Sequence, residues 1–85
     1  TFIVTEKPDE VAKVIMEDLD RGATGICGKG MYSGQEKTII FCVVNKKEIV
    51  KLKELVDDID PDAFVIVSDA REVHGEGFRY IQMGD

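Results

Sequence analysis

Two short segments combine glycines with a few polar and aromatic residues, and their residue types could bind a small ligand. Residues 28–34 are Gly-Lys-Gly-Met-Tyr-Ser-Gly, and residues 73–78 are Val-His-Gly-Glu-Gly-Phe. Glycines leave backbone amides open to an anion, a lysine neutralises its charge, and an aromatic ring stacks on a base or a sugar. Loops on a rigid scaffold are frequent binding sites. The candidate ligand-binding residues are therefore Gly28, Lys29, Gly30, Tyr32, Ser33, Gly34, His74, Gly75, Glu76, Gly77 and Phe78.

The first segment superficially suggests a phosphate-binding loop. A true P-loop needs Gly-Lys-Ser/Thr at the start of a helix, whereas residues 33–36 predict a turn between two strands. One interpretation is that the glycines only permit a bulged edge strand. The other is that Lys29 and the backbone amides contact an anion such as a nucleotide phosphate. Tyr32 has one role under each interpretation: it covers the edge of the core in the first and stacks on a base in the second.

Catalysis is not expected from this chain. His74 is the sole histidine, so no Ser-His-Asp or Cys-His arrangement can be argued. Asp69, Glu72 and Glu76 are near His74 in the sequence and could bind a cation with it, but acidic residues at strand ends are usually solvated. We expect no catalytic residue and no metal ligand, and the sequence identifies no cofactor.

Composition places the chain among small acidic globular domains. Its 85 residues make one domain, with a core over residues 1–70 and a C-terminal extension over 71–85. The net charge of −6 argues against nucleic acid and against an anionic membrane surface as partners. No apolar run approaches the ~20 residues of a membrane-spanning helix. The first residue, Thr1, is not an initiator methionine, so we expect a piece of a longer protein.

The two cysteines do not have the spacing of a zinc or redox motif. Cys27 and Cys42 fall in consecutive predicted strands. If the turn between those strands centres on residues 34–35, the two cysteines face each other across the pair. We expect two buried, reduced thiols rather than a disulfide, as in cytosolic proteins.

Hydrophobic periodicity and capping signals predict alternating strands and helices. A proline followed by two acidic residues begins the first helix, which Gly22 would end. Asn45 and Glu48 form a capping pattern at the start of the second helix, and Asp60-Pro61 ends it. The predicted elements are strands over 2–4, 23–32, 38–44 and 63–67, helices over 8–22 and 45–60, and an additional edge strand over 79–83.

This β-α-β-β-α-β order predicts an α+β fold of the ferredoxin-like type, with a four-stranded antiparallel sheet and both helices on one face. The opposite face would then expose alternate residues of strands that are apolar almost throughout, residues 38–44 most clearly. An exposed apolar patch usually marks an interface. The sequence therefore predicts a homo-oligomer, a dimer or a trimer, packed sheet to sheet.

Four runs of residues carry a resemblance to a known family over nearly the whole chain. They are residues 28–34, 42–44, 60–69 and 72–78, of which Asp-Pro-Asp-Ala-Phe and Gly-Glu-Gly-Phe are the most specific. The chain resembles the C-terminal domain of the YitT family of bacterial membrane proteins. This resemblance implies that transmembrane helices precede Thr1 and that the domain is a soluble appendage on the cytoplasmic side.

The same resemblance implies a PII-like fold. PII-like signalling proteins are trimers that bind small ligands, often nucleotides, in clefts between subunits. The loop of this chain that matches their functional loop, residues 31–37, is short.

Three hypotheses follow for the role of the domain. The first is a non-catalytic regulatory domain that senses a small anionic ligand such as a nucleotide at a subunit cleft. Residues 28–34 would form one wall of this cleft, and residues 74–78, from the same or a neighbouring subunit, would form the other. The second is an oligomerisation module that assembles the parent membrane protein without a ligand. The third is an amino-acid-binding module of the ACT type, with the same strand order.

Overall fold

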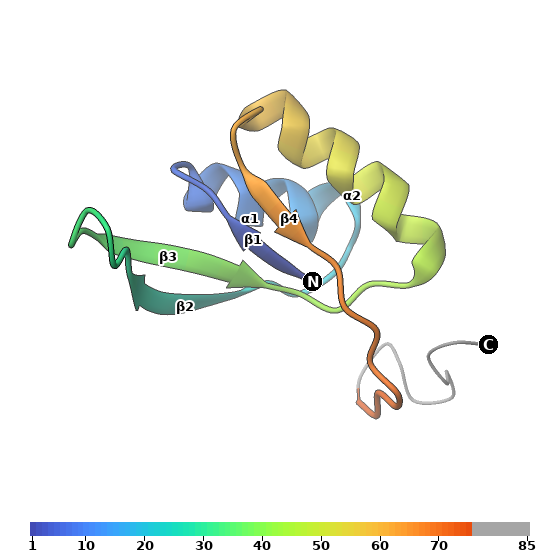
Figure 1. Cartoon of the computed structure of the whole chain (residues 1–85). Coiled ribbons are helices and arrows are strands. Elements are labelled where there is room, and N and C mark those ends of the chain that lie inside the picture. The colour runs from blue at the N-terminus through green and yellow to red at the C-terminus, as the bar shows by residue number, and fades with distance from the viewer. Residues whose placement is uncertain (76–85) are drawn as a thin grey trace.

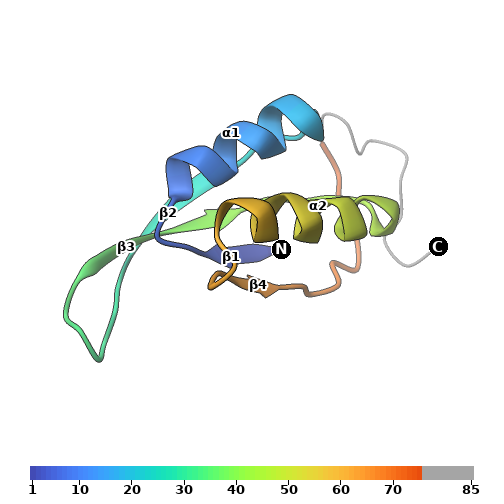
Figure 2. The ribbon, with the colours of Figure 1, turned by 90° about the horizontal axis from the view of Figure 1, so that it is seen from above.

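The computed structural model describes residues 1–75 and confirms the ferredoxin-like order of elements (Figure 1). The elements are β1 (Phe2–Val4), α1 (Pro8–Asp18), β2 (Thr24–Lys29), β3 (Glu36–Phe41), α2 (Lys46–Ile59) and β4 (Phe64–Ile66). The four strands form one antiparallel sheet in the order β2-β3-β1-β4. Figure 2 shows both helices over the same side of this sheet.

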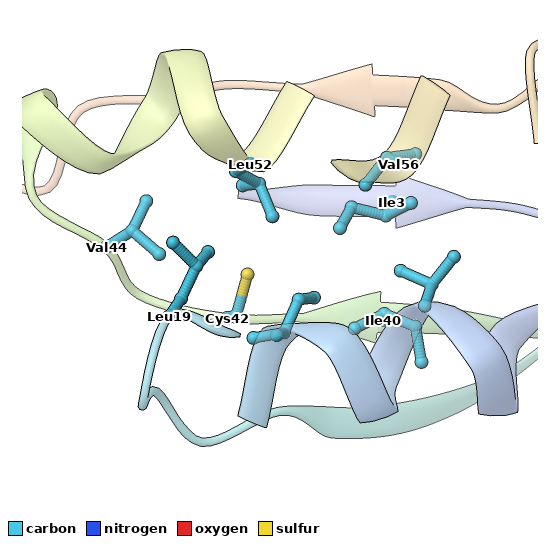
Figure 3. Packing of buried hydrophobic residues seen from close by; sticks show 9 residues of the cluster. Ile3, Leu19, Ile40, Cys42, Val44, Leu52 and Val56 are labelled. Atoms are coloured by element: carbon cyan, nitrogen blue, oxygen red, sulfur yellow. The ribbon is translucent and has the colours of Figure 1, made fainter. Parts of the chain in front are cut away.

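The hydrophobic core lies between the sheet and the two helices (Figure 3). Ile3 and Ile40 pair across β1 and β3 and point toward the helices. Helical spacing places the buried residues of α1 and α2 on the faces that meet them. Within residues 1–75, the buried cluster consists of Ile3, Val11, Ile15, Leu19, Ile40, Cys42, Val44, Leu52 and Val56.

The first helix begins at Pro8 as predicted but ends earlier than predicted. The helix ends at Asp18, and the amides of Leu19 and Arg21 both donate to the carbonyl of Ile15, at 3.2 and 3.3 Å. The positive φ near the end of this helix is at Asp20, at 54°, and not at Gly22. An aspartate tolerates this conformation better than most residues, so the glycine is not needed to end the helix.

Both ends of α2 are confirmed. The amide of Asn45 donates to Glu48 Oε1 at 2.8 Å, which is the Glu48 half of the capping box. Arg21 Nε donates to both carboxylate oxygens of Glu48, at 3.1 and 3.2 Å, and so ties the α1–β2 connection to the start of α2. Asp60 follows the last residue of the helix, and its amide donates to the carbonyl of Val56 at 2.8 Å.

The Asp60 side chain joins the end of α2 to the connection between β1 and α1. Thr5 Oγ1 donates to Asp60 Oδ2 at 2.6 Å, and the amide of Glu6 donates to the same oxygen at 3.2 Å. The amide of Asp62 donates to Asp60 Oδ1 at 3.1 Å. These hydrogen bonds, that from Thr5 foremost, lower the pKa of the Asp60 carboxyl below its ordinary value.

The turn between β2 and β3 lies two residues earlier than predicted. Lys29 pairs with Glu36 and Cys27 pairs with Thr38, so the turn centres between Tyr32 and Ser33. The strands are consequently shorter than the predicted 23–32 and 38–44. Cys27 therefore does not face Cys42, and the expectation that both are buried is wrong for Cys27, which is exposed. Both cysteines are free thiols, as expected, and burial raises the pKa of Cys42.

The fourth strand is also shorter than the predicted 63–67. The predicted edge strand over 79–83 lies outside the described residues.

Candidate functional site

The β2–β3 hairpin carries six of the predicted site residues on a projecting arm. Strand β1 pairs with β3 only over Ile39–Phe41, so the rest of the hairpin extends beyond the body of the domain (Figure 1). At its tip, Met31 and Tyr32 are 89% and 106% exposed. The residues gathered on this arm are Gly28, Lys29, Gly30, Tyr32, Ser33 and Gly34.

Within the tip, the backbone amides that were predicted to contact an anion donate hydrogen bonds to the turn itself. The amide of Gly30 donates to the carbonyl of Gln35 at 2.8 Å, and the amide of Gly34 donates to the carbonyl of Gly30 at 2.7 Å. The amide of Gln35 donates to Ser33 Oγ at 3.3 Å. Gly34 has a positive φ of 73°, which glycine adopts without strain. The glycines at 30 and 34 therefore shape the turn.

Positive charge is nevertheless present beside the tip. Lys29 and Lys37 line a shallow hollow on the arm together with Cys27, Gly28, Glu36 and Thr38. Lys37 Nζ lies 3.7 Å from Glu6 Oε1, so its charge is partly balanced. This hollow is the part of the predicted site that could still hold an anionic group.

The second predicted wall lies at the other end of the sheet. Ile66, the last residue of β4, pairs with Phe2, which in turn pairs with Phe41, whereas the hairpin tip lies beyond Glu36 at the opposite end of β3. The chain leaves β4 from that far end, away from the tip (Figure 1). His74 is exposed there and Gly75 is half-buried. Glu76, Gly77 and Phe78 lie outside the described residues.

A single copy of the chain therefore does not bring the two predicted walls together over the residues that the structure describes. Lys29 and Tyr32 could meet His74 only if a second copy supplied one of the walls.

The open face of the sheet is apolar across all four strands. Ile3 points into the core, so its neighbours Phe2 and Val4 point away from the helices. Cross-strand pairing places Thr24, Phe41 and Ile66 in one row with Phe2. It places Ile26, Ile39 and Phe64 in a second row with Val4. Seven of these eight side chains are apolar and none is charged, and we call these two rows the open face.

Several residues of the open face are largely exposed. Phe64 is 70% exposed and Ile66 is 52% exposed, and both lie on the edge strand β4. The rings of Phe2 and Phe41 contact each other, with centroids 5.1 Å apart. At this end of the face the two rings help to line a hollow of about 170 Å³, with Val67 and Ser68 on another wall. The sequence predicted that this face exposes alternate residues of apolar strands, and Phe2, Phe64 and Ile66 are exposed on it.

No helix within residues 1–75 is both long enough and apolar enough to cross a membrane. Likewise, the described part of the chain contains no group of three or more His, Cys, Asp or Glu residues that could hold a metal ion.

Comparisons with known proteins agree with this fold. The chain is 45% identical over 76 residues to the UPF0750 membrane protein YpjC of Bacillus subtilis, covering 89% of this chain and 26% of that protein. It is 30% identical over 74 residues to the UPF0750 membrane protein YitT of the same organism, covering 87% of this chain and 26% of that protein. The chain thus spans about a quarter of the length of these membrane proteins, and the resemblance to the YitT family is confirmed.

A solved structure provides the corresponding likeness of fold. The crystal structure of a DUF2179 protein from Eubacterium ventriosum is 39% identical in sequence and superimposes with a TM-score of 0.69, covering 79% of this chain and 92% of that one. The model of the family described as "Uncharacterized protein conserved in bacteria (DUF2179)" matches residues 21–75, which is more than half of the chain. On these matches and on its fold, the chain belongs to the DUF2179 family.

Proposed function

We propose that this domain is an assembly module, which holds copies of a longer membrane protein together through the open face of its sheet. The observation that carries the proposal is the composition of that face, on which seven of eight side chains are apolar and none is charged. Burial of apolar surface is the main favourable term in protein association. The relatives named above are membrane proteins, which supports a longer parent chain of this kind.

A second copy of the domain is the partner that fits this face best. The chain has a net charge of −6, so two copies repel each other wherever their charged surfaces meet. The open face avoids this repulsion because it carries no charge. The same net charge disfavours nucleic acid and anionic lipid as alternative partners. Two-fold packing of like faces is the commonest form of protein self-association.

The size of the face indicates a weak association. Four strands about 4.8 Å apart and two rows about 7 Å apart give a patch on the order of 300 Å² per copy. Two such patches bury about 600 Å² in total, which is roughly half of what a stable interface needs. The isolated domain should therefore dimerise only at high concentration. Copies held in one membrane by their parent chains have a much higher effective concentration, and the same contact then suffices.

Sedimentation equilibrium of the purified domain tests this proposal. We expect a reversible monomer–dimer equilibrium whose dimer fraction rises over a concentration range of about 10 μM to about 1 mM. A domain that stays monomeric over the whole range would contradict the proposal.

Ligand sensing is a second candidate function, supported by the hollow beside Lys29 and Lys37. In this proposal, an anion such as a nucleotide binds between the arm of one copy and the 74–78 segment of another. A thermal-shift screen against nucleotides, amino acids and divalent metals tests it. A ligand at about 100 times its Kd adds about 2.7 kcal/mol of stability, which moves the Tm of a domain this small by about 10 °C or more. Lys29→Ala should abolish the shift without lowering the Tm of the free domain, and the absence of any shift counts against this function.

We further propose that the domain lies on the cytoplasmic side of the bacterial membrane. The exposed thiol of Cys27 makes this testable, because a membrane-impermeant thiol reagent reacts only with the side that it can reach. Labelling of Cys27 in the full-length protein should occur in inside-out vesicles and not in intact cells. The reverse pattern would contradict the proposal.

A further inference from the structure

The outer edge of β2 is a second surface, separate from the open face, and its backbone geometry can be derived from the sheet. The amide of Gly30 donates to the carbonyl of Gln35, so these two residues form a hydrogen-bonded pair. Hydrogen-bonded and non-hydrogen-bonded pairs alternate along an antiparallel ladder. The backbone groups of Thr24, Ile26 and Gly28 therefore point toward β3. Those of Gly25, Cys27 and Lys29 point outward, away from the sheet.

The hydrogen bonds on the other side of β3, toward β1, independently give the same assignment of inward and outward backbone groups in β2. Thr1 and Cys42 exchange two hydrogen bonds, of 2.9 and 3.1 Å. By the same alternation, Ile40 points its backbone groups to β1, and Ile39 and Phe41 point theirs to β2. Ile39 pairs with Ile26 and Phe41 pairs with Thr24, which agrees with the assignment made from the hairpin tip.

The β2 edge lacks the features that usually prevent strand pairing. It has no neighbouring strand on its outer side among the described residues, and five of its six residues are exposed. Natural edge strands are commonly protected by proline, by bulges, by charges or by being very short. Strand β2 has no proline, its pairing with β3 is continuous over six residues, and Lys29 at its end is its one charge. The opposite edge, β4, is only three residues long.

We infer that the β2 edge pairs with the β2 edge of a second copy of this chain, antiparallel about a two-fold axis at Cys27. The outward-pointing residues then meet in symmetric pairs: Cys27 opposite the partner's Cys27, and Gly25 opposite the partner's Lys29. Each hydrogen-bonded pair exchanges two N–H···O bonds, so three pairs form about six bonds. The two sheets become one sheet of eight strands.

The side chains along the edge fit this register. Lys29 lies opposite a glycine, so no like charges are directly opposed, which would be destabilising. Ile26 lies opposite the partner's Gly28, which leaves space for the larger side chain. If the register between the two β2 strands shifted by one residue, outward-pointing backbone groups of one strand would lie opposite inward-pointing groups of the other. The alternation of the ladder excludes this register. The strand is thus complementary to itself, which favours a second copy over an unrelated peptide.

Disulfide trapping tests the pairing directly. In a hydrogen-bonded antiparallel pair the two Cα atoms lie about 5.5 Å apart, within the range of about 4.4–6.8 Å that a disulfide spans. Diamide oxidises the two Cys27 thiols to one S–S bond and takes up the two electrons and two protons. We expect a covalent dimer on a non-reducing gel, lost in Cys27→Ser and retained in Cys42→Ser, because Cys42 is buried.

Two controls keep this pairing distinguishable from association through the open face. Phe64→Lys should leave the Cys27-linked dimer unchanged, since Phe64 lies on the far edge of the sheet. Cys27→Pro removes an outward amide without removing a bond of the β2–β3 ladder. In the Phe64→Lys background, which suppresses association through the open face, it should weaken the edge dimer in sedimentation relative to Cys27→Ser. A circular-dichroism melt verifies that each variant is folded.

Three results would overturn the inference. The first is a failure of Cys27 to link at a concentration where Cys27→Ser sediments as a dimer. The second is linking that proceeds equally fast in denaturing urea, which would reflect random collision. The third is linking that appears only after residues 76–85 are deleted, which would mean that this chain's own C-terminal segment covers the edge.

Discussion

Substitution of Phe64 by lysine should weaken self-association more than any other single change on the open face. Phe64 is 70% exposed in one copy and lies in the row formed with Val4. A phenylalanine buries roughly 200 Å², so an interface would cover about 140 Å² of this residue. At about 25 cal/mol per Å², this area contributes about 3.5 kcal/mol per copy, and a two-fold interface contains it twice.

These figures are upper bounds, because association also costs side-chain freedom and the rim of a small patch stays wet. We therefore expect Phe64→Lys to raise the dimer Kd at least about 100-fold, which corresponds to about 2.7 kcal/mol. Sedimentation equilibrium measures the change, with Phe64→Lys and its reference domain both carrying Cys27→Pro, so that only association through the open face is counted. The Tm of the monomer should hardly move, because the Phe64 ring is exposed rather than part of the core.

The chain offers a matched control for this experiment. Val50 is 65% exposed, but it lies on α2, on the other side of the sheet. Val50→Lys changes the net charge by the same amount and also removes an exposed apolar side chain, so it should leave the Kd within about twofold. If Phe64→Lys and Val50→Lys weaken association equally, the effect is not specific to the open face, and the reasoning from that face is refuted.

Further predictions concern the stability of the fold. Leu52→Ala should lower the free energy of unfolding by about 2–5 kcal/mol in urea denaturation, because Leu52 is fully buried; a cost below about 1 kcal/mol would contradict the described core. Gly34→Ala should cost about 1–2 kcal/mol because of the positive φ at that position, whereas Gly22→Ala, with open space around it, should be neutral or stabilising. The lowered pKa of Asp60 means that its hydrogen bonds stabilise the fold above the ordinary pKa of about 4 and are lost as the pH falls through the folded-state value. The Tm of Asp60→Asn should therefore depend less on pH below about 4 than that of the unmodified domain, and parallel Tm–pH curves would refute this assignment.

The order of elements was predictable because each helix has a strong local signal. Pro8 lies at the first helical position, Glu48 caps the second helix, and Asp60-Pro61 follows its last turn. The position of the hairpin turn was not predictable to the same degree. Glycines at 28, 30 and 34 permit turns at several positions, and the register is decided by pairing of Ile39 and Ile40 with both neighbouring strands.

The exposure of part of the candidate site was predictable, whereas its hydrogen bonding was not. Lys29 and Tyr32 are exposed on the arm, as loop residues usually are. The sequence could not show that the amides of Gly30 and Gly34 are used within the turn, because this depends on the turn geometry. It also could not place Phe64 and Ile66 on one face with Phe2, since three-residue strands are too short to show an alternation.

The projecting arm has a consequence for how members of this family can vary. Beyond Ile39 the hairpin consists of two strands that pair only with each other, so its length is independent of the core. Two residues inserted near the tip, one in each strand, would lengthen the arm by about 3.4 Å without moving any buried side chain. Natural variation in chain length should therefore concentrate at this tip, because the length of the arm can change there while the packing of the core stays the same.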